Sequence, residues 1–159
     1  MTDPPGVALS PAEIAVPAGN FPEVRARFPD HVLDAVGDGR IWADAGPAAL
    51  AATHQTWVRD PVTDAYLLDV LREPHDGTTW VFRHDPAIRL PRAEVVERTS
   101  DGVPRLAPDL VLLFKAKRPR PKDQADFDRV VPRLPLARRH RLAALLARAH
   151  PGHQWLTRL

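Results

Sequence analysis

The chain has 159 residues, 44% of them hydrophobic and 26% charged, which is the balance of a soluble protein long enough to form a core. A formal net charge of only +2 argues against a one-signed basic face for nucleic acid, and the absence of cysteine excludes disulfides and thiolate metal sites. The sequence has neither a run of about 18 apolar residues nor a signal-like leader, so we predict a cytoplasmic protein without a membrane span.

The chain begins with a predicted disordered segment, followed by a strand and a helix. Prolines block regular structure in residues 1–12, which we expect to form a disordered lead-in. Glu13–Pro17 is a short strand candidate. Phe21, Val24 and Phe28 then fall on one face of a helix.

Strand-like segments dominate the next part of the chain. Val32–Val36 and Arg40–Trp42 enclose a Gly-Asp-Gly turn, which predicts a hairpin. Residues 43–52 form a connector with room for a short helix. Residues 53–83 predict a meander of three antiparallel strands, in which Ala65–Glu73 is the strongest strand.

The second half of the sequence is predicted to be helical. A short helix is expected at Pro91–Val96, and longer helices should begin at Pro108 and Pro121, because proline favours the first helical turn. Leu136–His150 is amphipathic and predicts a long helix.

These elements predict an α+β fold with a mixed or antiparallel sheet followed by a C-terminal helical half. We expect a single domain over residues 13–159. Its strand-rich part is residues 13–90 and its helical part is residues 91–159.

Two acidic residues lie inside strand-like segments. Asp69 interrupts the apolar run "YLLDVL", where an unpaired charge is costly. It either faces water or an arginine, or it belongs to a metal or proton-transfer site, since a carboxylate on a rigid strand is well placed for Mg²⁺ or as a general base. Glu13 is the second such acid, and two carboxylates on neighbouring strands commonly hold Mg²⁺ beside a nucleotide.

The densest charged stretch is "KAKRPRPKDQADF", which contains Lys115, Lys117 and Lys122. One interpretation is a proline-stiffened turn between helices, with lysines that complement the helix dipole. The other is that one or more of these lysines holds a phosphate, which the family resemblance given below would make a nucleoside triphosphate. The stretch has no interleaved aromatic residues for stacking on bases, which argues against nucleic-acid binding.

Several segments together resemble one family. "EIAVPAGNFPEVRARFPDHVLDAVGDGRIW", "LAPDLVLLFKAKRPRPKDQADF" and "HPGHQWL" are similar to the aminoglycoside 2''-nucleotidyltransferase-like proteins of the polymerase-beta-like nucleotidyltransferase superfamily. The resemblance runs from Glu13 to the C-terminus. It implies a nucleotidyltransferase-like sheet and the transfer of a nucleoside monophosphate from Mg²⁺-bound nucleoside triphosphate to a hydroxyl of an aminoglycoside-like small molecule.

The resemblance also implies roles for single residues. Glu13 matches the second of two metal-binding acids, and Asp69 matches a third acid that binds metal or acts as general base. Pro11 stands where the family has its first metal-binding acid, and no Gly-Gly pair precedes Glu13. The resemblance therefore implies an incomplete catalytic centre with impaired activity. The alternative is a non-catalytic remnant or binding protein of the same fold.

The implied partners are a nucleoside triphosphate and a small hydroxylated acceptor, and we expect neither nucleic acid nor a membrane as a partner. The family's first strand and helix, which cover one face of the sheet, find no counterpart in this sequence. We therefore expect open apolar surface near Val16, Trp57 and Tyr66, and possible self-association through it.

Overall fold

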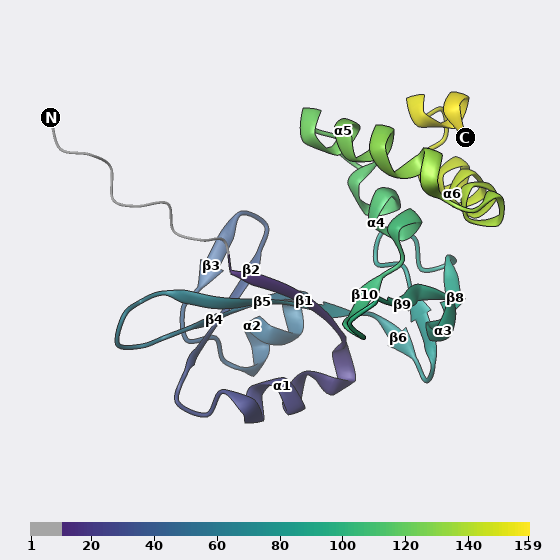
Figure 1. Cartoon of the computed structure of the whole chain (residues 1–159). Helices are drawn as coiled ribbons and strands as arrows, with labels where there is room; N and C mark the ends of the chain where they lie inside the picture. The colour runs from purple at the N-terminus through teal and green to yellow at the C-terminus, as the bar shows by residue number, and fades with distance from the viewer. Residues whose placement is uncertain (1–10) are drawn as a thin grey trace, which may run out of the picture. The chain divides into compact units, whose positions relative to one another are not determined.

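The structure is a computed structural model that describes residues 11–159, and the chain divides into two compact units (Figure 1). The first unit ends at His75 and the second is Asp76–Leu159. The predicted α+β class is confirmed, since the chain contains both sheets and helices and its last part is helical. Of the predicted lead-in, residues 1–10 lie outside the described residues, and the first strand begins at Ala12.

The first unit is built on a five-stranded sheet in the order β1-β5-β4-β2-β3. β1 and β5 run parallel, whereas the other neighbouring strands run antiparallel. The predicted first strand and hairpin are confirmed. The strands are β1 (Ala12–Pro17), β2 (Val32–Gly37), β3 (Arg40–Trp42), β4 (Gln55–Arg59) and β5 (Tyr66–Glu73).

The turn between β2 and β3 explains why the hairpin could be predicted. Asp38 and Gly39 have φ angles of 48° and 71°, in the left-handed region that a two-residue type I′ hairpin turn requires at both central positions. Aspartate and glycine tolerate this region better than other residues do. The local sequence therefore fixes the register of these two strands.

Two helices, α1 (Phe21–Arg27) and α2 (Pro47–Ala52), cover one face of the sheet, with a 3-10 turn (Ala18–Asn20) before α1 (Figure 1). The core of the unit lies between these helices and the sheet. Its buried residues are Phe21, Leu33, Ala35, Leu50, Val58 and Val70. Because strand side chains alternate between faces, the residues next to these core positions lie on the opposite face.

The second unit combines small sheets with a helical part. β6, β7 and β8 form one sheet, and β9 pairs with β10. The strands are β6 (His75–Asp76), β7 (Thr79–Val81), β8 (Arg89–Pro91), β9 (Val96–Arg98) and β10 (Pro104–Leu106). The helices are α3 (Arg92–Val95), α4 (Pro108–Lys115), α5 (Pro121–Val130) and α6 (Leu136–Ala149), with 3-10 turns at Val131–Arg133 and Gln154–Arg158.

The meander predicted over residues 53–83 is wrong in its third strand. β4 and β5 pair as expected, but β7 joins β6 and β8 in a separate sheet. The β9–β10 hairpin was not predicted either, because strands of three residues are too short to show an alternating pattern. Strand pairing over such short segments depends on tertiary contacts that the local sequence does not reveal.

A buried carboxylate joins the helices of the second unit. Asp109, near the start of α4, is fully buried and accepts hydrogen bonds from Arg138 Nη1 at 3.0 Å and Arg141 Nε at 2.7 Å, both on α6. Arg141 also donates to the backbone carbonyl of Glu94 at 3.1 Å. The apolar faces of α4 and α6 pack around this network, with Leu110, Leu142 and Leu146 among the fully buried residues.

The C-terminal segment docks through an imidazole. His153 Nδ1 accepts a hydrogen bond from the Trp155 amide at 3.1 Å, and its ring also bonds the Ala116 backbone at the end of α4. Trp155 is buried, stacks on Phe127 at 4.4 Å and donates from Nε1 to Gln124 Oε1 at 2.7 Å. Burial, with a contribution from the neighbouring His150, lowers the pKa of His153.

We predict that Asp109→Ala lowers the free energy of unfolding by about 3 kcal/mol or more, because two arginines lose a buried carboxylate between them. Asp128→Ala is the control, since it removes an exposed ion pair with Arg158 that solvent screens. Urea denaturation followed by circular dichroism measures both. A loss in Asp109→Ala no larger than in the control would contradict this role.

We also predict acid-sensitive docking of the C-terminal segment. Since the pKa of His153 is lowered in the folded chain, its contribution to stability is complete above about pH 6.5 and is lost as the pH falls below that value through the folded pKa. The loss of unfolding free energy between neutral and acidic pH should be smaller in His153→Asn than in the wild type. The exposed His140→Asn serves as control, and an equal loss in all three proteins would refute the prediction.

Candidate functional site

The parallel pairing of β1 with β5 brings the two sequence-predicted acids together. Glu13 and Asp69 are direct partners in the register of the two strands. Both lie on the face opposite the helices, because their neighbours Ile14 and Val70 point into the core of the first unit. Glu13 is exposed and Asp69 is half-buried. The sequence could not show this adjacency, since more than fifty residues separate the two acids along the chain.

Asp69 has only part of its hydrogen-bonding capacity satisfied. Its Oδ2 accepts from Gln55 Nε2 at 2.8 Å, but its Oδ1 is buried without a partner among the described residues. Trp57, the register partner of Asp69 on β4, likewise has a buried Nε1 without a partner there. An unpartnered acceptor and an unpartnered donor therefore come from adjacent positions on one face of the sheet. Such groups are costly unless a bound molecule satisfies them.

A second aspartate in the same cross-strand row shows the opposite arrangement. Asp34, the register partner of Trp57 on β2, is buried and accepts from Arg59 Nε at 2.7 Å and from the Asp44 amide at 2.9 Å. Burial acts to raise the pKa of Asp34, but the bonds from Arg59, Asp44 and Tyr66 outweigh it and lower the pKa. Asp34 is thus a fully bonded structural carboxylate.

The carboxylate pair provides ligands of the kind that Mg²⁺ uses. Mg²⁺ is commonly bound by one or two carboxylates together with substrate phosphates and water. Glu13 and Asp69 supply two carboxylates, and the buried Oδ1 of Asp69 is an acceptor without a partner among the described residues. Within residues 11–159, no group of three or more His, Cys, Asp or Glu side chains could hold a metal ion by itself. The pair therefore fits Mg²⁺ that arrives with a phosphate ligand better than a permanent metal site.

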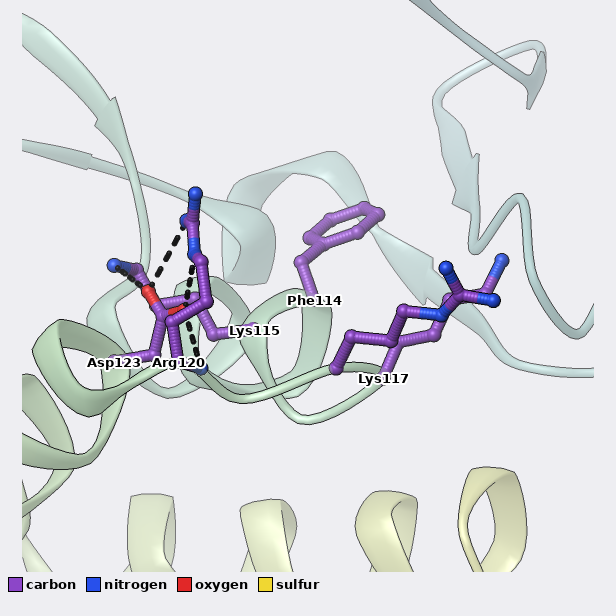
Figure 2. A pocket seen from close by; sticks show the side chains of 6 residues that line it. Phe114, Lys115, Lys117, Arg120 and Asp123 are labelled. Carbon is purple, nitrogen blue, oxygen red and sulfur yellow. Dashed lines mark hydrogen bonds and ion pairs between the residues drawn. The ribbon is translucent and has the colours of Figure 1, made fainter. Parts of the chain in front are cut away.

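A second candidate site is an open depression of about 720 Å³ at the link between α4 and α5 (Figure 2). Four of its six lining residues are cationic and one is anionic. They are Phe114, Lys115, Lys117, Arg118, Arg120 and Asp123. Figure 2 shows Phe114 between the Lys115–Arg120–Asp123 group and Lys117.

Lys115 is held inside a local ion-pair network. Its Nζ lies 2.9 Å from Asp123 Oδ1 and 2.7 Å from Asp126 Oδ2. The bond to Asp126 is the main cause that raises the pKa of Lys115, and contacts with Asp123 add to it against the effect of burial. Asp123 also accepts from the Arg120 amide and guanidinium, and this guanidinium bond is the main cause of its lowered pKa. These contacts fix the start of α5 and support the structural interpretation of Lys115.

The other two predicted lysines differ from Lys115. Lys117 is exposed and lines the depression, and its Nζ lies 3.4 Å from His84 Nδ1. Lys122 is exposed on the first turn of α5 and is not among the lining residues. Sequence reasoning missed Arg118 and Arg120, although their alternation with Pro119 and Pro121 in "RPRP" was the available signal.

No family model, curated protein or solved structure matches this chain. The resemblance to nucleotidyltransferases therefore stays a hypothesis. Among the helices of residues 11–159, none combines the length and apolar character that a membrane crossing requires.

The apolar surface expected near Val16, Trp57 and Tyr66 is only partly open. Val16 packs against the core of the first unit. Trp57 and Tyr66 are half-buried and meet edge to face with ring centroids 4.8 Å apart. Ile41 and Leu67, elsewhere in this unit, are exposed. Self-association stays a prediction.

The different environments of Asp69 and Asp34 lead to a stability test. Asp69→Asn should leave the free energy of unfolding unchanged or raise it, because it removes an incompletely bonded buried charge. Asp34→Asn, the matched substitution in the same row, should lower it by about 2 kcal/mol, because Arg59 loses its buried partner. Thermal and urea unfolding of both variants compare them directly. A greater loss in Asp69→Asn would mean that Asp69 is the structural carboxylate.

Proposed function

We propose that this chain is a nucleotidyltransferase-like protein. It would bind Mg²⁺-nucleoside triphosphate and transfer the nucleoside monophosphate, at an impaired rate, to a hydroxyl of an aminoglycoside-like small molecule. The observation that carries the proposal is the direct pairing of Glu13 with Asp69 on one face of the sheet, together with the unpartnered Oδ1 of Asp69. A sequence resemblance pointed to these same two residues.

The two carboxylates would have different roles. Glu13 and Asp69 would hold Mg²⁺, which when bound supplies charge neutralisation for the phosphates. Asp69 would also take the proton of the acceptor hydroxyl. The hydroxyl oxygen would then form a bond to the α-phosphorus as the bond to the departing pyrophosphate breaks. Gln55, which donates to Asp69 Oδ2, would hold that carboxylate in position.

The impaired rate of nucleotide transfer is inferred from the residue just before the first strand. Pro11 directly precedes β1 and lies two residues before Glu13, where the family that the sequence resembles has a further metal-binding acid. Proline has no side-chain oxygen to offer a cation. The loss of one electrostatic contribution to the transition state typically lowers the rate by a factor of about 10² to 10³. We propose that the reaction takes place in the cytoplasm, where nucleoside triphosphates are available. The reducing conditions there do not affect a chain without cysteine, because it has no disulfides to lose.

A second candidate is a binding protein of the same fold that holds a nucleotide without transferring it. Pro11 favours this alternative, and so does the finding that no three potential metal ligands gather among residues 11–159. Binding of Mg²⁺-nucleotide needs fewer ligands than alignment of a transition state does. The two candidates share the binding step and differ in the release of pyrophosphate.

Calorimetric titration with MgATP and MgGTP tests the shared step. We expect micromolar to submillimolar binding by the wild type, and binding weaker by about tenfold or more in Asp69→Ala, because a metal-ligand oxygen is lost. Glu23→Gln is the control, since it removes an exposed acid of α1 in the same unit. Absence of heat with both nucleotides, or equal binding by wild type and Asp69→Ala, would contradict the proposal.

Pyrophosphate release with and without an aminoglycoside acceptor then separates the two candidates. Acceptor-dependent release that Asp69→Ala abolishes supports transfer. Nucleotide binding without release supports the binding protein.

A further inference from the structure

We infer that the depression at the α4–α5 link binds a chain of condensed phosphates. The residues that bind it are Lys117, Arg118 and Arg120, rather than Lys115 and Lys122. The ligand class is a polyphosphate chain, either free or as part of a nucleotide. Its assignment to a nucleotide rests on the proposed function. The affinity for the phosphate chain itself rests on the depression alone.

The cations of the depression fall into two groups. Lys115 is bonded to Asp123 and Asp126 at 2.9 and 2.7 Å, so its charge is already neutralised. Lys117 and Arg118, in contrast, contact no carboxylate within residues 11–159, and both are exposed. Two adjacent cations without acidic partners repel each other, and a bound anion removes that repulsion.

Arg120 adds a third donor whose position is fixed. Its Nε and Nη2 bond to Asp123 at 2.8 and 3.4 Å, which anchors the guanidinium and leaves Nη1 for a ligand. An anchored guanidinium loses less conformational entropy on binding than a free one. The guanidinium of arginine keeps its charge, so a bond from Nη1 to a phosphate oxygen would be charge-assisted.

The backbone holds these three cations close together before any ligand arrives. Pro119 and Pro121 fix φ on both sides of Arg120, so the link between the helices has few alternative conformations. α4 ends at Lys115, and the network around Asp123 fixes the first turn of α5. The segment from Lys117 to Arg120 is thus held at both ends.

Phe114 supplies an apolar wall beside the cations (Figure 2). Its ring packs against Phe82 at 4.9 Å, and the guanidinium of Arg83 lies 4.6 Å above it. A phosphate chain alone would use only the cations, whereas a nucleotide could add contacts between its base or ribose and this ring. This difference lets the two sources of the phosphate chain be distinguished.

The test is calorimetric titration of the full chain with sodium tripolyphosphate in EDTA, so that Mg²⁺ at Glu13 and Asp69 plays no part. Arg118→Ala should bind about tenfold more weakly than the wild type, the effect expected for one lost charge-assisted interaction. Lys122→Ala removes the same charge from a nearby exposed position outside the depression and should bind as the wild type does. Both side chains are exposed, and circular dichroism checks that both variants fold.

Two results would overturn the inference. One is no binding of tripolyphosphate by the wild type. The other is equal weakening in Arg118→Ala and Lys122→Ala, which would indicate general attraction to a basic surface.

Two further titrations separate this inference from the proposed function. Asp69→Ala should bind tripolyphosphate as the wild type does. If it does so but MgATP titrations show no dependence on Asp69, the phosphate site stands and the proposed function fails.

The second titration distinguishes the two sources of the phosphate chain. The affinities for ATP and for tripolyphosphate, both in EDTA, are measured on the wild type and on Phe114→Ala. Tighter binding of ATP that depends on Phe114 supports a nucleotide, and equal binding supports the phosphate chain alone.

Discussion

The first unit depends on the parallel pairing of β1 with β5. This pairing joins the start of the described chain to a strand more than fifty residues later, and it completes one edge of the sheet. It also fixes which residues share a face. Ile14, Val16, Leu68 and Val70 pack on the helix side, which forces Glu13 and Asp69 onto the opposite side. A shift of one residue would exchange the two sets, so burial of the apolar residues holds the acids in place.

The aspartates of this protein show how a structural carboxylate differs from an available one. Asp34, Asp109 and Asp123 are all buried, and each accepts bonds from at least one basic side chain. Asp69 has one bond from a neutral amide and one buried oxygen without a partner in the described chain. Desolvation penalises both kinds of group, but only the first kind recovers the cost from partners within the fold. The remaining oxygen of Asp69 is therefore what a ligand can use.

The basic stretch between α4 and α5 combines two roles that looked like alternatives. Lys115 and Asp123 act as structural groups that fix the start of α5, and Arg120 shares in this network. Lys117 and Arg118 take no part in it and remain exposed. The ion-paired group around Asp123 is thus rigid, and it lies next to two cations, Lys117 and Arg118, that have no acidic partner among the described residues. Charge density in the sequence alone cannot separate these groups, because neighbouring lysines can have unlike partners.

The sequence by itself determined the α+β class, the β2–β3 hairpin and the helices that begin at Pro108 and Pro121, because these features depend on local periodicity, turn residues and proline. It also singled out Asp69 as an acid among apolar residues. Only the tertiary structure decided that Glu13 lies beside Asp69 and that β7 pairs outside the predicted meander. It also decided that Asp123 and Asp126 neutralise the charge of Lys115. Each of these outcomes depends on contacts between segments distant in the chain, and such contacts are selected by burial and partner geometry rather than by local pattern.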